Sequence, residues 1–387
     1  MSPLDEEVRL PKHVLDDVLL PVMTLRESAL ESNAAVMQAY VERHGLLFAP
    51  HMKTHMAPAL ARRQTDLGAW GVTVASVQQA VAAWDHGFHR ILVANEVLDP
   101  AGLAWIARRR ELDAGADVLF QVDSAAGVAA AADHGPLPVL VEIGFPGGRT
   151  GVRSPADGVA LARAARSAGL EVRGVTGYEG GLPGPDEARE YVRGVLAATA
   201  AVRPLVTATR TLLSMGGSAW FDAVVDAVAD RPDDVDVLLR SGASLTHDDG
   251  FYAERTPFAR HPEEGRLEAA IRVWGRVTSA PEPGLALVAV GKRDISFDEG
   301  LPVVREVRPG GTARARPVTP VPGSVTVTRL DDQHCYLRTT PDAPAVAPGD
   351  VVVFGVSHPC TVFDKWREVL VLADDDTVLD TIETVFR

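Results

Sequence analysis

Short apolar runs rich in β-branched residues alternate with amphipathic segments between residues 46 and 241. The amphipathic segments carry alanine and arginine at helical spacing, as in residues 103–110. Runs that are apolar throughout and alternate with helices are typical of a parallel sheet covered by helices. Eight such runs occur, at Leu46–Met52, Gly71–Ala75, Arg90–Ala94, Asp117–Val122, Pro138–Ile143, Val172–Tyr178, Thr211–Met215 and Asp236–Leu239.

Eight βα units over about 200 residues predict a closed (β/α)₈ barrel of the TIM type. We expect this barrel to occupy residues 26–255. An open doubly wound α/β sheet is the alternative that the same pattern allows.

The pattern changes after about residue 255, where helical spacing fades and short alternating runs appear between proline- and glycine-rich turns. Alternation with period two, punctuated by such turns, predicts an antiparallel β domain. We expect it to span residues 256–387, joined by roughly residues 1–25. Its clearest runs are Ile271–Val277, Ala286–Val290, Ser324–Thr328, Cys335–Arg338 and Asp350–Phe354.

Composition narrows the classes of protein. The chain is 46% hydrophobic and 23% charged, as in ordinary globular proteins. A formal charge of −14 argues against a nucleic-acid partner, which would need a basic face. No apolar run approaches the roughly 18 residues of a membrane span, and the acidic N-terminus does not resemble a signal peptide. With only two cysteines, we expect a cytoplasmic protein without a disulfide framework.

Lysine is rare in this chain, which has four lysines among its 38 basic residues. One of them, Lys53, follows the apolar run 46–49 where that strand should end. A primary amine can form an imine with a carbonyl compound, whereas arginine cannot deprotonate to do so. Lys53 is therefore a candidate for Schiff-base chemistry, with a surface lysine as the alternative. His51 and His55 flank it and either tune it or pack beside it.

Two glycine-rich turns follow strands seven and eight. They are Ser214-Met215-Gly216-Gly217-Ser218 and Ser241-Gly242-Ala243-Ser244. Glycines let backbone N–H groups approach an anion, and phosphate sites of such barrels often lie after these two strands. A lysine together with a phosphate site indicates a phosphorylated aldehyde, for which pyridoxal 5′-phosphate (PLP) is the obvious candidate.

Ser357-His358-Pro359-Cys360 follows an apolar strand of the β domain. One imidazole and one thiolate on a rigid turn suit a divalent metal, Zn²⁺ first, with Mn²⁺ or Mg²⁺ as alternatives. Two protein ligands would leave positions open, as in a catalytic site. A buried cysteine beside an incidental histidine is the alternative interpretation.

Pro50-His51-Met52-Lys53-Thr54-His55 resembles the PLP-lysine motif of the D-threonine aldolase and D-serine dehydratase family. This family has the fold-type III architecture of the alanine racemases. The segments 291–302 and 357–366 also resemble the β-domain sequence of the family. The resemblance covers nearly the whole chain, and it implies a PLP-binding barrel with a metal-binding β domain.

The resemblance assigns roles position by position. Lys53 would form the imine with PLP, Arg149 would lie beside the ring, and Tyr178 would contact the cofactor. His358 and Cys360 would bind the metal. Cofactor contacts are further predicted in the two glycine turns, at Ser214, Gly216, Gly217, Ser241 and Gly242. Arg240 would either face the pyridine nitrogen or stabilise the barrel.

Members of this family act on D-amino acids with a β-hydroxyl group, and PLP serves as the electron sink. The resemblance favours a dehydratase that releases a 2-oxo acid and ammonia, because dehydratases of the group have His-x-Cys and the aldolases His-x-Asp. Retro-aldol cleavage to glycine and an aldehyde is the alternative. A racemase is less favoured, since only Tyr336 lies well inside the β domain, and a non-catalytic PLP carrier would lack that domain. A homodimer is implied by resemblance only, and D-serine, D-threonine and D-threo-3-hydroxyaspartate all remain candidate substrates.

Overall fold

A computed structural model describes residues 13–113, 115–314 and 316–386. Contacts between residues divide the chain into two compact units. Of the described residues, one unit contains 34–244, 255–265 and 385–386, and the other contains 13–33, 245–254 and 266–384. Residues 1–12 of the N-terminal segment that we assigned to the β domain lie outside the described residues. Within the described ranges, no helix has both the length and the apolar character that a membrane span requires.

The first unit is built on eight parallel strands in the order β2-β9-β8-β7-β6-β5-β4-β3. The strands are β2 (Leu47–Phe48), β3 (Val72–Val74), β4 (Arg90–Glu96), β5 (Asp117–Val122), β6 (Pro138–Glu142), β7 (Glu171–Thr176), β8 (Thr211–Ser214) and β9 (Val235–Leu239). The first and last strands of this order, β2 and β3, come together just beyond their paired residues. His51 forms an isolated parallel β-bridge with Thr73, and the Trp70 N–H donates to the Phe48 carbonyl oxygen at 2.7 Å. The predicted eight-stranded barrel is confirmed.

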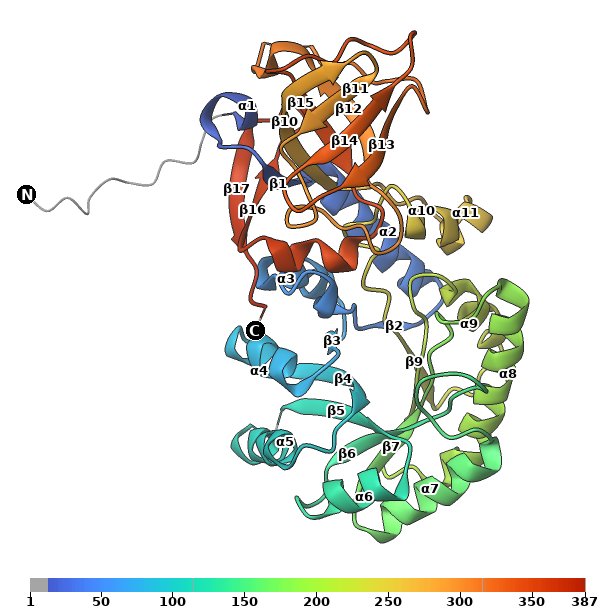
Figure 1. The fold of residues 1–387 in the computed structure, drawn as a ribbon. Coiled ribbons are helices and arrows are strands. Elements are labelled where there is room, and N and C mark those ends of the chain that lie inside the picture. Colours follow the sequence, from blue (N-terminus) through green and yellow to red (C-terminus); the bar gives the residue numbers. More distant parts are fainter. Residues whose placement is uncertain (1–12, 114, 315, 387) are drawn as a thin grey trace, which may run out of the picture. The chain divides into compact units, whose positions relative to one another are not determined.

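Helices lie on the outer side of these strands (Figure 1). They are α3 (Pro58–Asp66), α4 (Val77–Asp85), α5 (Pro100–Leu112), α6 (Ala125–Ala132), α7 (Pro155–Ser167), α8 (Pro185–Val202) and α9 (Phe221–Ala227), with α11 (Pro257–Arg260) later in the chain. Two further helices are α2 (Glu27–Arg43), of which residues 34–43 belong to this unit, and α10 (Phe251–Arg255), which belongs to the other unit except for Arg255. Ser76, Ser124 and Ser154 cap α4, α6 and α7 with their side-chain oxygens. Such caps satisfy backbone N–H groups that a helix leaves free at its start.

The interior of the barrel is filled by aliphatic side chains from several of its strands. One buried cluster joins Ala49, Leu92, Leu119, Leu140, Leu212 and Leu238. Because these side chains fill the centre, the barrel is a packed core, and its chemistry is confined to the carboxyl ends of the strands.

The second unit is a nine-stranded sheet that is antiparallel except where β1 pairs in parallel with β16. The strands are β1 (Val22–Arg26), β10 (Ile271–Glu282), β11 (Leu285–Val288), β12 (Val303–Arg308), β13 (Val325–Leu330), β14 (Cys335–Thr339), β15 (Val351–Gly355), β16 (Glu368–Leu372) and β17 (Val378–Glu383). Short elements accompany them, namely α1 (Val14–Asp17), η3 (Pro309–Gly311), η4 (Pro359–Thr361) and η5 (Phe363–Lys365). The predicted C-terminal β domain is confirmed, with β1 supplied by the N-terminal segment.

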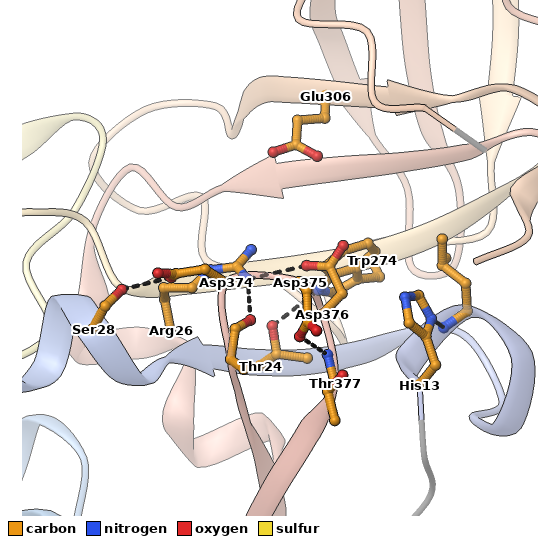
Figure 2. Close-up of polar contacts among 12 residues, drawn as sticks. His13, Thr24, Arg26, Ser28, Trp274, Glu306, Asp374, Asp375, Asp376 and Thr377 are labelled. Carbon is orange, nitrogen blue, oxygen red and sulfur yellow. Dashed lines mark hydrogen bonds and ion pairs between the residues drawn. The ribbon is translucent and has the colours of Figure 1, made fainter. Parts of the chain in front are cut away.

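A polar network joins β1 to the turn between β16 and β17 (Figure 2). Asp376 accepts from Arg26 at 3.0 Å and from Arg308 on β12 at 2.7 Å. Trp274 donates its indole N–H to the Thr24 hydroxyl at 2.9 Å inside the core. These contacts satisfy polar groups that burial would otherwise penalise.

Candidate functional site

Lys53 lies in a single 3-10 turn, η1 (Met52–Thr54), directly after the first barrel strand. We expected that strand to run to Met52, but it is paired with β9 only over Leu47–Phe48. Pro50, which has no N–H to donate to a ladder, favours the early end. Met52 and Thr54 are buried on either side and Lys53 is half-buried. The buried neighbours on both sides thus fix the backbone of Lys53.

The two histidines beside Lys53, His51 and His55, differ in their hydrogen bonds. His55 is buried and its Nδ1 accepts from the Ala57 N–H at 2.9 Å, so it shapes the loop that leads into α3. Burial lowers the pKa of His55 to about 3, which keeps the ring neutral. His51 Nδ1 is buried and has no hydrogen-bond partner among the described residues.

Three cations lie near enough to His51 for their charges to act on its ring. Burial is the main reason why the pKa of His51 is well below its ordinary value, and the charges of Lys53, Arg240 and Arg149 lower it further. The structure thereby brings together the predicted imine lysine, the arginine of strand eight and the arginine of the Arg-Thr-Gly segment. A partly enclosed group of cations beside a neutral imidazole favours an anionic ligand.

The turn after β9 and the serine of the turn after β8 form a small polar cradle. Ser218 Oγ lies 3.1 Å from Ser241 Oγ and accepts from the Ala243 N–H at 3.2 Å. A Cβ placed on Gly242 would lie 2.5 Å from the Cβ of His51, so only glycine fits there. Hydroxyl groups and N–H groups at a glycine turn are suitable donors for a phosphate. Ser241 and Gly242 therefore lie where a phosphate could be held, together with Ser218.

The amides of Gly216 and Gly217 have a partner that the sequence did not reveal. They donate to the buried carboxylate of Glu179, at 3.3 Å and 2.5 Å. Gly216 has a φ of +89° and a Cβ there would lie 2.4 Å from Leu239, so this position also requires glycine. A phosphate role for these two amides, which stays a prediction, would require Glu179 to release them.

Arg240 makes its contacts within the barrel. It donates to Thr176 Oγ1 at 3.0 Å, to Ser214 Oγ at 2.8 Å and to the Gly177 carbonyl oxygen at 2.7 Å. These bonds tie the ends of β7, β8 and β9 together. They also give Ser214 a structural partner, whereas we had predicted Ser214 as a cofactor contact.

Arg149 and Tyr178 meet at the ends of β6 and β7. The Arg149 guanidinium carbon lies 4.7 Å from the centre of the Tyr178 ring, within the range of a cation–π contact. Both residues line a cavity of about 240 Å³, with Glu142, Phe145 and Tyr191. Tyr191 fixes the backbone of Tyr178, because the Tyr191 hydroxyl accepts a hydrogen bond from the Tyr178 N–H at 3.0 Å. The cavity has the mixed aromatic and charged lining of a small-molecule site.

His358 and Cys360 lie together in the β unit, on either side of Pro359 at the start of η4. Burial opposes a charge on His358, but Cys360 and then Asp298 outweigh it and raise the His358 pKa to about 9. Asp298 lies 2.8 Å from His358 Nδ1 and also accepts from the Thr361 hydroxyl at 2.6 Å. The pocket thus favours a positive charge at this point.

The donor set fits a divalent metal with two protein ligands. A carboxylate on Nδ1 leaves Nε2 to bind a metal, as second partners of metal-bound histidines commonly do. Across the three ranges that the structure describes, no group of three or more His, Cys, Asp or Glu side chains gathers as a ligand set. A metal here would complete its coordination with water or substrate, which is typical of catalytic sites. Asp298 was overlooked because it lies about 60 positions earlier in the chain.

Comparisons with known proteins agree with this architecture. Residues 25–232, more than half of the chain, match the family described as "Alanine racemase, N-terminal domain". Residues 270–372 match the "Putative serine dehydratase domain". The chain is 28% identical to a D-threonine aldolase of Arthrobacter sp over 389 residues, which cover 96% of this chain and 94% of that protein.

Two solved structures have the same fold. The D-threonine aldolase of Filomicrobium marinum is 26% identical, with a TM-score of 0.79 and 97% of each chain covered. The D-threo-3-hydroxyaspartate dehydratase of Delftia sp. HT23 is 23% identical, with a TM-score of 0.77, covering 97% of this chain and 100% of that one. The barrel of this chain therefore belongs to the alanine racemase N-terminal domain family, and a serine dehydratase-type β domain follows it.

Proposed function

We propose that the chain is a PLP- and divalent-metal-dependent lyase acting on D-3-hydroxy amino acids, and that it catalyses dehydration to a 2-oxo acid and ammonia. The observation that carries the PLP assignment is that Lys53, Arg149 and Arg240 are close enough for their charges to act on His51, beside the serine-glycine cradle formed by Ser218, Ser241 and Gly242. A binding site for a phosphorylated aldehyde needs an amine that forms an imine with the aldehyde. It also needs cations and hydrogen-bond donors, such as the serine-glycine cradle, for the phosphate.

Residues of the barrel would bind PLP and transfer the Cα proton. Lys53 would hold PLP and, once released by the substrate, would accept the Cα proton at its Nζ atom. Ser218, Ser241 and the N–H group of Gly242 would hold the phosphate. Neutral His51 beside Lys53 adds no further positive charge, so the amine is not opposed by a protonated ring. PLP itself supplies the electron sink.

His358 and Cys360 would hold the metal, with Asp298 orienting the His358 ring. The metal would supply Lewis acidity toward a β-oxygen, since hydroxide is a poor leaving group. A D-threo-3-hydroxyaspartate dehydratase variant with alanine in place of a cysteine has been solved in a metal-free form. That description supports a role for Cys360 in metal binding in this chain.

Retro-aldol cleavage is the second candidate. It is favoured by the coverage of the relatives, because the Arthrobacter aldolase aligns with 96% of this chain, whereas the Delftia dehydratase aligns at 28% identity over 43% of it and 46% of its own length. Cys360 favours dehydration, since the resemblance associates His-x-Cys with dehydratases.

Product analysis separates the two reactions. The purified protein, loaded with PLP and Zn²⁺, is incubated with D-serine, D-threonine, D-threo-3-hydroxyaspartate and D-phenylserine, and with their L-enantiomers as controls. We expect a 2-oxo acid and ammonia from at least one D-substrate, and loss of that activity after chelation with EDTA. Glycine and an aldehyde would contradict dehydration, and activity that survives exhaustive metal removal would contradict the metal assignment.

A further inference from the structure

Two aromatic side chains stand beside His358 and have no part in the function proposed above. Phe251 and Tyr252 begin α10, and their ring centroids lie 5.7 Å and 5.8 Å from the centroid of the His358 ring. Their planes are tilted by 53° and 51° from the imidazole plane. The two rings also meet each other edge to face, with centroids 4.9 Å apart. The three rings therefore form one cluster, at separations that aromatic pairs prefer.

The backbone of this aromatic pair is joined to the turn that carries His358. The Phe251 N–H donates to the carbonyl oxygen of Ser357, the residue directly before His358, at 2.8 Å. A Cβ placed on Gly250 would lie 2.9 Å from both the Cα and the carbonyl oxygen of Ser357. Glycine at position 250 thus permits two segments that are distant in the sequence to approach closely.

Two acidic side chains fix the start of α10. Asp248 accepts hydrogen bonds from the N–H groups of Tyr252 and Ala253, both at 3.0 Å. Such bonds satisfy N–H groups that the first turn of a helix leaves without a partner. Asp249, the next residue, forms an ion pair with Arg272 on β10 at 3.1 Å. The two aromatic rings are therefore carried by a backbone that is itself held in place.

The imidazole of His358 needs more than one contact to keep a single orientation. Asp298 lies 2.8 Å from its Nδ1, and the Ser296 hydroxyl donates to the His358 carbonyl oxygen at 2.7 Å. One hydrogen bond at Nδ1 leaves the ring able to tilt about that bond. The neighbouring rings of Phe251 and Tyr252 restrict this tilt by packing. Metal ligands work best when packing and outer hydrogen bonds together lock their rotamers.

We propose that Phe251 and Tyr252 are positioning residues of the metal site, and that their rings hold the His358 imidazole where its Nε2 faces a divalent cation. The step to the cation rests on the proposed metal-binding role of His358, whereas the restriction of the ring does not. Removing an outer partner of a metal-bound histidine typically costs about 10–100-fold in metal affinity. We expect about the lower end of this range for the loss of either ring.

Motion of the His358 ring in the metal-free protein tests the inference without any metal. Carbon relaxation of isotopically labelled histidine rings is measured in the full chain for wild type, Tyr252→Leu and Tyr252→Phe. The His358 signal is assigned by its loss in His358→Gln. In Tyr252→Leu the order parameter of this ring should fall below about 0.6, as in flexible groups. Tyr252→Phe, which keeps the ring, should retain the wild-type value.

His55 serves as the internal control in these spectra, because it is buried in the barrel and belongs to the other unit. Its order parameter should be the same in all three proteins. An unchanged His358 order parameter in Tyr252→Leu would overturn the inference. An equal fall at His55 would also overturn it, since general loosening would then explain the effect.

Zn²⁺ affinity tests the consequence for the metal. Competition titration with a chromogenic chelator is applied to wild type, Phe251→Leu, Tyr252→Leu and Tyr252→Phe. Tyr336→Leu is the matched control, because Tyr336 is a half-buried tyrosine on β14 of the same unit. Phe251→Leu and Tyr252→Leu should bind Zn²⁺ about tenfold more weakly. Tyr252→Phe and Tyr336→Leu should bind it as the wild type does.

Wild-type affinity in both leucine variants of α10 would overturn the positioning role. An equal loss in Tyr336→Leu would overturn it as well, because the effect would then not be specific to the cluster. If the wild type itself binds no Zn²⁺, the proposed metal site fails instead. The order parameter of the His358 ring then decides the inference on its own.

Discussion

Arg240 is a buried cation whose hydrogen bonds all stay inside the barrel. Replacing Arg240 by alanine would leave the Thr176 and Ser214 hydroxyls and the Gly177 carbonyl with fewer partners. We expect a loss of about 2–4 kcal/mol in the free energy of unfolding. Arg240→Lys should lose an intermediate amount, because one ammonium nitrogen cannot span three acceptors. Urea denaturation measures the free energy of unfolding of both variants. A free energy of unfolding for Arg240→Ala equal to that of the wild type would contradict the structural role of Arg240.

The two cysteines provide a matched pair for testing the metal site. Cys360 lies beside His358, whereas Cys335 is fully buried in β14 and burial raises its pKa to about 12. Cys360→Ala should weaken Zn²⁺ binding by at least about tenfold, because it removes one of two protein ligands. Cys335→Ala should bind Zn²⁺ as the wild type does. Competition titration with a chromogenic chelator gives both affinities, and equal affinities for the two variants would remove Cys360 from the site.

At the residue scale, the sequence singled out candidate residues by their distinctive side chains and gave no sign of the acidic residues that the structure places against them. Lys53 was recognisable because lysine is rare, and His358 and Cys360 because they are close in sequence. Glu179 and Asp298 are ordinary acidic residues, and their importance comes from long-range contacts. Glu179 lies 37 positions from Gly216, and Asp298 lies 60 from His358. Pairing over such distances is decided by the fold.

At the level of elements, Asp376 joins the turn between β16 and β17 to β1 and β12 of the β unit. It lies in the turn between β16 and β17, is buried, and pairs with Arg26 on β1 and Arg308 on β12. Asp376→Asn would leave the buried Arg308 with Glu306 as its remaining acidic partner. We expect a loss of about 2–4 kcal/mol in the free energy of unfolding. Asparagine tolerates the positive φ of 67° at this position, so the backbone should keep its conformation.

Asp374 is the control for this prediction. It is exposed and bonds Ser28 at 2.7 Å (Figure 2), two positions from Asp376. Asp374→Asn should change the free energy of unfolding by less than about 0.5 kcal/mol, as exposed polar contacts contribute little. Equal losses for the two variants would show that the turn, not the buried charge, decides stability.

The strands of the barrel could be predicted well, and those of the β unit less completely. Every barrel strand is an apolar run bounded by turn residues, so pattern alone placed all eight to within a few residues. Four strands were not placed, namely β1 (Val22–Arg26), β12 (Val303–Arg308), β16 (Glu368–Leu372) and β17 (Val378–Glu383). All four are short, and β12 mixes exposed and buried positions where it pairs with β15. Such strands are defined by their partners more than by their own sequence.

At the scale of the whole molecule, each unit carries its own candidate ligand site, PLP in the barrel and a metal in the β unit. A ligand that binds only the folded state stabilises the part of the protein that holds it. We expect PLP to slow hydrogen exchange in residues 50–56 and 240–243, and Zn²⁺ to slow it in residues 296–300 and 357–361. Hydrogen exchange followed by mass spectrometry shows which residues each ligand protects. Protection by PLP that is confined to the β unit would contradict the assignment of PLP to the barrel.

The homodimer implied by the family resemblance stays a prediction about the whole molecule. Light scattering coupled to size-exclusion chromatography measures the mass directly. A mass near twice the 41.2 kDa of one chain would support it, and a mass near 41.2 kDa would contradict it.

Covalent attachment of PLP tests the central claim most directly. The protein is loaded with PLP, reduced with borohydride to convert an imine into a stable amine, and digested for mass spectrometry. The chain has four lysines, Lys12, Lys53, Lys292 and Lys365, so the modified position can be assigned without ambiguity. We predict one pyridoxyl phosphate group per chain, on Lys53, and none in Lys53→Arg. A modification on Lys292 or Lys365 that persists in Lys53→Arg, or no modification at all, would contradict the account.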